Sequence, residues 1–178
     1  MSTRSDFFEN YYLKVPGFIT PARAAELANA VETDAQLGPD RSQVIGADIV
    51  YNSMPLLELL CEKTPIVSRL LGEPVLPTYV FARVYGKGSR LVRHSDRPAC
   101  EISLSLSLAA THKWPLCIAA AKGDACVDLS PGDAMLYFGN IDHWRDEFKG
   151  KKVVQTFLHY VRSRGGNAAH YFDRINGR

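Results

Sequence analysis

The sequence predicts a mainly β protein with N-terminal helices, built around a double-stranded β-helix barrel of the jelly-roll type. Two observations predict this fold. From Leu76 onward, short β-branched and aromatic runs alternate with turn signals, a pattern typical of antiparallel strands. The first part of the chain instead carries helix-forming segments that are able to cover one sheet. An open antiparallel sheet with helices on one face is the structural alternative.

Two helical segments are expected in the first half of the chain. Thr20 is a suitable N-cap, and Pro21 is a suitable first helical residue ahead of an Ala-, Leu- and Glu-rich stretch. A second helical region is expected over residues 55–72. Within it, Pro65 indicates the start of a new helix and Gly72 the end.

The second half of the chain contains the predicted strands. They cover residues 78–86, 90–96, 101–108, 114–120, 125–129, 134–139 and 151–163. Turn signals rich in glycine, such as Ser-Pro-Gly-Asp at 130–133, separate them. No linker, repeat or low-complexity segment interrupts the pattern. We therefore expect one domain over residues 1–178, with a helical cover at about 20–72 and a jelly-roll core at about 76–163.

Composition excludes several classes of protein. The chain has 178 residues, of which 46% are hydrophobic and 22% charged, as in an ordinary globular protein. A formal charge of +2 is too small to indicate nucleic-acid binding. No uninterrupted apolar run of about 18 residues is present, and the N-terminus lacks the features of a signal peptide. The expectation is a soluble cytoplasmic protein with no membrane partner, and its oligomeric state is not readable.

The four cysteines are expected to be reduced thiols. Cys61, Cys100, Cys117 and Cys126 form no CxxC pair, which argues against a zinc ribbon and against a thioredoxin-type redox site. Free cysteines behave as small buried hydrophobes. We therefore interpret all four as packing residues.

A metal site is indicated by three residues on two predicted strands. His94 and Asp96 are two apart, so the strand period of two points both side chains to one face. A third ligand must come from another strand, and His143 is the candidate. Two imidazoles and one carboxylate form a facial triad with open coordination positions, as in non-haem iron(II) enzymes. The alternative is that His94 only caps a strand or pairs with Asp96.

Three segments give the sequence a family resemblance. The strings VYGKGSRLVRHSD, DLSPGDAMLYFGNIDHW and GKKVVQTFLHYV, in this order, resemble the prolyl 4-hydroxylase-like branch of the 2-oxoglutarate- and iron(II)-dependent oxygenases. The similarity extends from about Tyr11 to Val161. It implies that His94, Asp96 and His143 are the iron ligands.

The resemblance also implies residues for the co-substrate 2-oxoglutarate. Lys152, nine residues after the last ligand, would pair with its distal carboxylate. Thr156, on the same strand face as Lys152, would be a second contact, and Tyr85 would be a third. Many relatives carry arginine at the basic position, and a lysine supplies only a point charge. Arg145 and Arg83 are candidate substrate residues, although Arg145 could instead pair with a neighbouring carboxylate.

The remaining histidines are not expected to bind the metal. On β alternation, His159 faces away from Lys152, so we interpret it as a hydrogen-bonded or surface histidine. His112 and His170 are also not expected to be ligands.

The implied activity is that of a dioxygenase that uses iron(II), 2-oxoglutarate and O2. It would hydroxylate an unactivated C–H bond of a small molecule or of an amino-acid or peptide side chain, and release succinate and CO2. Relatives that halogenate carry a small residue in place of the carboxylate, so Asp96 favours hydroxylation. The alternatives are a non-catalytic jelly-roll module that binds a metal or a sugar, and a different metalloenzyme on the same barrel.

Overall fold

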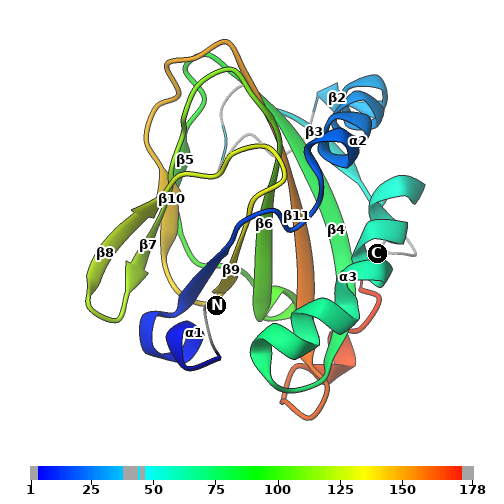
Figure 1. The fold of residues 1–178 in the computed structure, drawn as a ribbon, viewed down its shortest axis with the longest axis vertical. Helices are drawn as coiled ribbons and strands as arrows, with labels where there is room; N and C mark the ends of the chain where they lie inside the picture. The colour runs from blue at the N-terminus through cyan, green and yellow to red at the C-terminus, as the bar shows by residue number, and fades with distance from the viewer. Residues whose placement is uncertain (1–3, 38–43, 45–46, 174–178) are drawn as a thin grey trace.

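The computed structural model describes residues 4–37, 44 and 47–173, which form two facing antiparallel sheets with helices on one outer face (Figure 1). The helices are α1 (Arg4–Asn10), α2 (Pro21–Asp34) and α3 (Met54–Leu71), with short 3-10 helices η1 (Pro98–Cys100) and η2 (Ala168–His170). The strands are β1 (Tyr12–Val15), β2 (Gln36–Leu37), β3 (Ala47–Tyr51), β4 (Val75–Gly86), β5 (Leu91–His94), β6 (Ile102–Ala110), β7 (Leu116–Ala120), β8 (Gly123–Val127), β9 (Ala134–Phe138), β10 (His143–Arg145) and β11 (Lys152–Arg162).

The two sheets have the topology of a jelly roll. The larger sheet has seven strands in the order β1-β9-β6-β11-β4-β3-β2, and the smaller has four in the order β5-β10-β7-β8. The second half of the chain alternates between the sheets, so strands distant in sequence become neighbours. This arrangement confirms the predicted fold, and the open single sheet is wrong because a second sheet faces the first.

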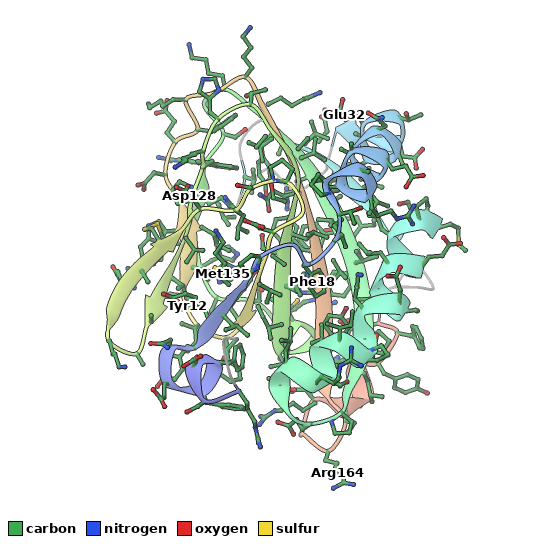
Figure 2. All side chains as sticks on the ribbon, viewed as in Figure 1. Tyr12, Phe18, Glu32, Asp128, Met135 and Arg164 are labelled. Carbon is green, nitrogen blue, oxygen red and sulfur yellow. A yellow bond between two sulfur atoms is a disulfide. The ribbon has the colours of Figure 1, made fainter. Side chains whose placement is uncertain are left out.

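Apolar side chains fill two separate layers (Figure 2). One layer lies between the larger sheet and the helices and includes Phe18 and Leu27. The other lies between the two sheets and includes Met135, Tyr85 and Trp114. The larger sheet therefore has an outer face packed under helices and an inner face that forms one wall of the barrel.

The alternation of side chains along β11 follows these two layers. Val153 and Phe157 belong to the inner layer, whereas Val154 and Leu158 belong to the layer under the helices. Side chains of a strand alternate between faces with a period of two. Lys152 therefore begins β11 on its outer face.

The helices form largely where the sequence predicts them. Thr20 caps α2, because its hydroxyl oxygen accepts a hydrogen bond from the Arg23 amide at 3.2 Å. Gly72 ends α3 in the left-handed conformation with φ 76°. The predicted helix start at Pro65 is wrong: α3 continues through it, because buried Leu60 and Val67 anchor both halves. No described helix is long and apolar enough to cross a membrane.

The prediction of four reduced cysteines is wrong for two of them. Cys117 and Cys126 lie directly opposite each other on β7 and β8 and form a disulfide. The pairing depends on the hairpin register, which brings together two residues nine positions apart. Cys61 and Cys100 form no disulfide within the described part of the chain. Because disulfides are rare in reducing compartments, the cytoplasmic location stays a prediction.

We predict that the double substitution Cys117→Ser/Cys126→Ser lowers the free energy of unfolding by about 2–3 kcal/mol, the loop-entropy contribution expected for a short closed loop. Urea unfolding of the oxidised protein and the variant measures this difference. Cys61→Ser, at an exposed free thiol, is the control and should leave the midpoint unchanged. Equal midpoints for the double variant and the unsubstituted protein would contradict the prediction.

Candidate metal centre and its pocket

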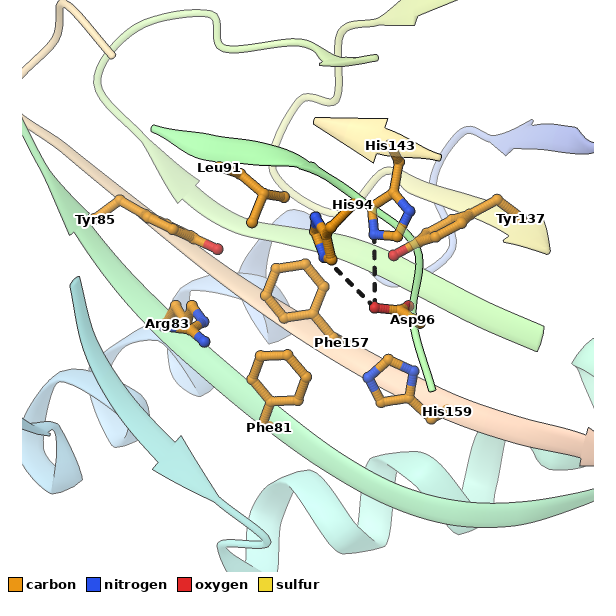
Figure 3. A pocket seen from close by; sticks show the side chains of 10 residues that line it. All are labelled: Phe81, Arg83, Tyr85, Leu91, His94, Asp96, Tyr137, His143, Phe157 and His159. Atoms are coloured by element: carbon orange, nitrogen blue, oxygen red, sulfur yellow. Dashed lines mark ion pairs between the residues drawn. The ribbon is translucent and has the colours of Figure 1, made fainter. Parts of the chain in front are cut away.

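A pocket between the two sheets holds the predicted metal residues (Figure 3). Side chains from β4, β5, β9, β10 and β11, and one from the segment after β5, form its walls. They are Phe81, Arg83, Tyr85, Leu91, His94, Asp96, Tyr137, His143, Phe157 and His159.

The structure brings the three predicted ligands together. His94 and His143 are paired directly across the ladder between β5 and β10. Their Nε2 atoms lie 3.6 Å and 3.7 Å from the same oxygen, Oδ1 of Asp96. Strand β5 ends at His94, so Asp96 lies just beyond it and not within it. One ligand atom from each residue lies within 4.8 Å of the others, a suitable arrangement for a single metal ion.

Backbone carbonyls orient both imidazoles. The Nδ1–H of His94 donates to the Val92 carbonyl at 2.8 Å, and the Nδ1–H of His143 donates to the Ile141 carbonyl at 2.9 Å. A carbonyl only accepts, so each bond fixes the tautomer that leaves the Nε2 lone pair available. Both lone pairs are therefore held ready for a metal ion by hydrogen bonds on the far side of each ring.

The carboxylate of Asp96 is oriented in a similar way. Ser103 Oγ donates to its Oδ2 at 3.1 Å, and the Asp96 amide donates to the Gly139 carbonyl at 2.7 Å. Burial by itself raises the pKa of Asp96, but contact with His94 and the charge of His143 outweigh it and lower the pKa. Asp96 is therefore ionised at neutral pH, with Oδ1 directed toward the histidines.

The two histidines differ in their proton affinity. Burial lowers the pKa of His143, so its neutral, metal-binding form is favoured. For His94, burial lowers the pKa, but the contacts with Asp96 and the Val92 carbonyl outweigh it and raise the pKa. A metal ion must therefore displace a proton from His94 more often than from His143.

Two imidazole nitrogens and one carboxylate oxygen suit an iron(II) ion with open coordination positions. A structural zinc site would need a fourth protein ligand. Cys100 and His159 form a second possible group with Asp96, on the other side of that carboxylate. Neither of the two described groups includes His112 or His170. The donor set therefore fits the metal that the sequence predicts.

Two predicted co-substrate residues do not lie in the pocket. The ammonium group of Lys152 pairs with Glu32 of α2 at 2.7 Å, and 45% of its side chain is exposed. Thr156 donates its hydroxyl hydrogen to the Phe81 carbonyl at 3.0 Å, on the same outer face. The structure therefore does not place either residue among those that line the pocket, and their contact with a co-substrate stays a prediction. The sequence correctly places both residues on one strand face, but that face packs against the helices.

Two other predicted residues, Tyr85 and Arg83, do line the pocket. Tyr85 is buried and contacts Trp114 edge to face at 4.8 Å between ring centres. Arg83 has 5% of its surface exposed, and its guanidinium carbon lies 5.6 Å from the centre of the Phe81 ring. Both come from β4, two residues apart on its inner face.

Arg145 is a fully buried cation next to this pocket. It lies on β10 two residues after His143 and opposite Leu91. One Nη donates to the Trp114 carbonyl, and the guanidinium lies 4.9 Å from the Trp114 ring centre. Its Nε and other Nη have no hydrogen-bond partner within the described part of the chain. Burial lowers the pKa of Arg145 to about 10, so it stays charged at neutral pH.

Sequence reasoning missed two residues of the site. His159 is buried in the pocket wall, and its ring is hydrogen-bonded to Ser103 Oγ at 2.9 Å. It is thus a hydrogen-bonded histidine, as expected, but its position beside Asp96 was not foreseen. His159 lies two residues after Phe157 on β11, so the strand period could have placed both side chains on the same inner face. Gly139 was also missed: its carbonyl holds the Asp96 amide, and a Cβ there would collide with the Cys100 carbonyl oxygen.

We predict that Gly139→Ala weakens iron(II) binding about 10- to 100-fold, the range seen when residues that orient metal ligands are changed. The added methyl group must displace the backbone beside Cys100 and thus move Asp96. Anaerobic calorimetric titration with iron(II) measures the affinity. Gly86→Ala is the matched control, because a Cβ there meets open space. Unchanged affinity in folded Gly139→Ala protein would show that this contact does not position Asp96.

The fold of this chain is similar to that of several solved structures. No protein-family model matches the sequence, and no curated protein matches it. Several solved structures do match. The α-ketoglutarate-dependent epimerase SnoN from nogalamycin biosynthesis has a TM-score of 0.76 at 13% identity, over 90% of this chain and 81% of that chain. HygX from Streptomyces hygroscopicus, with nickel and 2-oxoglutarate bound, has a TM-score of 0.73 at 11% identity, over 89% and 85%.

A third structure, a prolyl-4-hydroxylase from Pseudomonas putida, has a TM-score of 0.71 at 16% identity, over 92% of this chain and 98% of that chain. At identities this low, the structural similarity establishes the fold alone, and the chemistry must be argued from the residues of the site. The chain therefore has the fold of the 2-oxoglutarate- and iron(II)-dependent oxygenases, as its sequence resemblance predicts.

Proposed function

We propose that the protein is an iron(II)- and 2-oxoglutarate-dependent dioxygenase that hydroxylates an unactivated C–H bond and releases succinate and CO2. The observation that carries this proposal is the convergence of the Nε2 atoms of His94 and His143 on Oδ1 of Asp96 inside the barrel. A ligand set of this kind leaves coordination positions open for reactants. That feature favours an enzyme over a module that only binds a metal or a sugar.

Some residues of the site would bind iron(II), and others orient the metal ligands or form the wall of the pocket. His94, Asp96 and His143 would hold iron(II), which when bound supplies the chelation of the keto acid and the activation of O2. The carbonyls of Val92 and Ile141 keep the imidazoles in the metal-binding tautomer. The stacked rings of Phe81 and Phe157, with centres 4.7 Å apart, form an apolar wall that limits the access of water.

We assign the distal carboxylate of 2-oxoglutarate to Arg145 in place of Lys152. Arg145 shares the inner face of β10 with His143, and two of its guanidinium nitrogens lack partners among the described residues. A buried guanidinium is stabilised strongly by a carboxylate that it binds with two hydrogen bonds. Tyr85 lines the pocket and contacts the Trp114 ring, over which the Arg145 guanidinium also lies, so it is the expected hydroxyl contact.

The experiment is an anaerobic titration of the iron(II)-loaded protein with 2-oxoglutarate, followed by the weak visible band of the metal chelate. We expect the band in the unsubstituted protein. Arg145→Met should weaken 2-oxoglutarate binding at least about tenfold, because the charged hydrogen bonds are lost. Lys152→Met, which removes only an exposed ion pair, should leave the affinity unchanged.

Three outcomes would contradict these assignments. Absence of the band in the iron-loaded, unsubstituted protein would refute the proposed function. Weaker 2-oxoglutarate binding in Lys152→Met, with normal binding in Arg145→Met, would show that Lys152 binds the distal carboxylate. Loss of iron(II) affinity in Arg145→Met would show that the arginine acts on the metal site itself.

The proposed primary substrate is a small molecule. HygX has been solved with hygromycin B bound, and SnoN with nogalamycin RO, both small molecules. The pocket of this chain is formed by strands of both sheets and has mixed aromatic and charged walls. No nucleic-acid partner is proposed.

A further inference from the structure

The barrel contains more buried positive charge than the metal and the co-substrate require. Asp96 and the chelating carboxylate of 2-oxoglutarate balance the two charges of iron(II). The distal carboxylate balances Arg145, as proposed above. Arg83 remains, and no described carboxylate forms an ion pair with it. Isolated buried charges are costly, so proteins retain them where an anion binds.

Arg83 differs from Arg145 in its relation to the pocket. Arg83 lines the pocket together with the metal residues, whereas Arg145 lies next to it, against the Trp114 ring. Next to Arg83 on the inner face of β4 is Phe81, a partly exposed ring. Phe81 in turn contacts Tyr51, which is 44% exposed, at 5.6 Å between ring centres. These rings lead from Arg83 to the surface.

Arg83 lines the same pocket as the three metal ligands. Figure 3 shows Arg83 and Phe81 on β4, facing His94 and Asp96 across the pocket. A group bound to this guanidinium would therefore lie on the wall of the pocket that faces the metal ligands.

We propose that Arg83 binds a carboxylate of the primary substrate, which makes the substrate a small organic acid whose apolar part lies along Phe81 and Phe157. This inference rests on the proposed oxygenase function. A planar guanidinium matches a carboxylate in a two-bond geometry, and stacked rings suit an aromatic or aliphatic body. The acid group fixes the substrate on the wall opposite the metal, which presents one C–H bond to the reacting position.

The test uses protein loaded with manganese(II) and 2-oxoglutarate, which binds ligands without turnover and enhances proton relaxation near the metal. The probes are 3-phenylpropionate and its neutral amide, 3-phenylpropionamide. We expect saturable relaxation enhancement of the acid, and at least about tenfold weaker binding of the amide. Arg83→Met should bind the acid as weakly as the amide.

Arg93→Met is the matched control. Arg93 is on β5 but exposed, where it pairs with Asp142 at 3.1 Å outside the pocket, so this variant should retain the preference for the acid. The iron(II) and 2-oxoglutarate band should persist in both variants, which separates substrate binding from co-substrate binding.

The inference is overturned if the unsubstituted protein binds neither probe, binds both equally, or if Arg83→Met keeps the preference for the acid. Loss of the 2-oxoglutarate band in Arg83→Met would instead assign Arg83 to the co-substrate. Tighter binding of 2-phenylethyl phosphate than of 3-phenylpropionate would replace the carboxylate with a phosphate. Absence of the band from the unsubstituted protein would refute the proposed oxygenase function itself. If the band is present and one of the other contradicting results is obtained, only the proposed substrate class is refuted.

Discussion

The antiparallel register between β5 and β10 sets the metal centre, because it places His94 directly opposite His143. Strand pairing fixes which side chains face each other across a sheet, and a shift by one residue would turn one histidine away. Asp96 depends on the same arrangement, since it follows β5 and is held by the Gly139 carbonyl at the end of β9. The ligands are thus positioned by backbone hydrogen bonds of both sheets before any metal binds.

A second constraint is the charge inside the barrel. Arg83 and Arg145 are both buried, and Asp96 is the acidic residue among the described pocket-lining residues. Removing a guanidinium from water is unfavourable unless a counter-ion compensates. Among the described residues, two nitrogens of Arg145 have no hydrogen-bond partner and Arg83 has no ion pair, as expected of a protein whose buried charges are balanced by anionic ligands. This imbalance is the reason for assigning the 2-oxoglutarate carboxylate to Arg145 and a substrate carboxylate to Arg83.

Much of the fold and of the metal site could be predicted from the sequence. Each of the seven predicted runs overlaps a strand of the structure, and Thr20 caps its helix as expected. The His-x-Asp spacing is local, so the sequence suffices to bring His94 and Asp96 together, although β5 ends at His94 and Asp96 follows the strand. These predictions depend on the conformation of short segments, which the order of neighbouring residues largely determines.

The features that could not be predicted depend on contacts between distant segments. The period of two divides β11 into two faces but does not say which face is inside. A count from His143 to Lys152 also crosses the ladder irregularity in β10 and the non-strand segment 146–151, so it does not keep a strand period. The disulfide depends on the β7–β8 register. The helix continues through Pro65 because packing outweighs local preference. In each case tertiary contacts decide between locally equivalent alternatives.

The most direct test of the account is a crystal structure of the protein with manganese(II) and 2-oxoglutarate bound. The account predicts metal bound by His94, Asp96 and His143, with the distal carboxylate of 2-oxoglutarate on the Arg145 guanidinium and Lys152 still paired with Glu32. A carboxylate bound to Lys152 at the outer face, or a metal ion bound elsewhere, would contradict it.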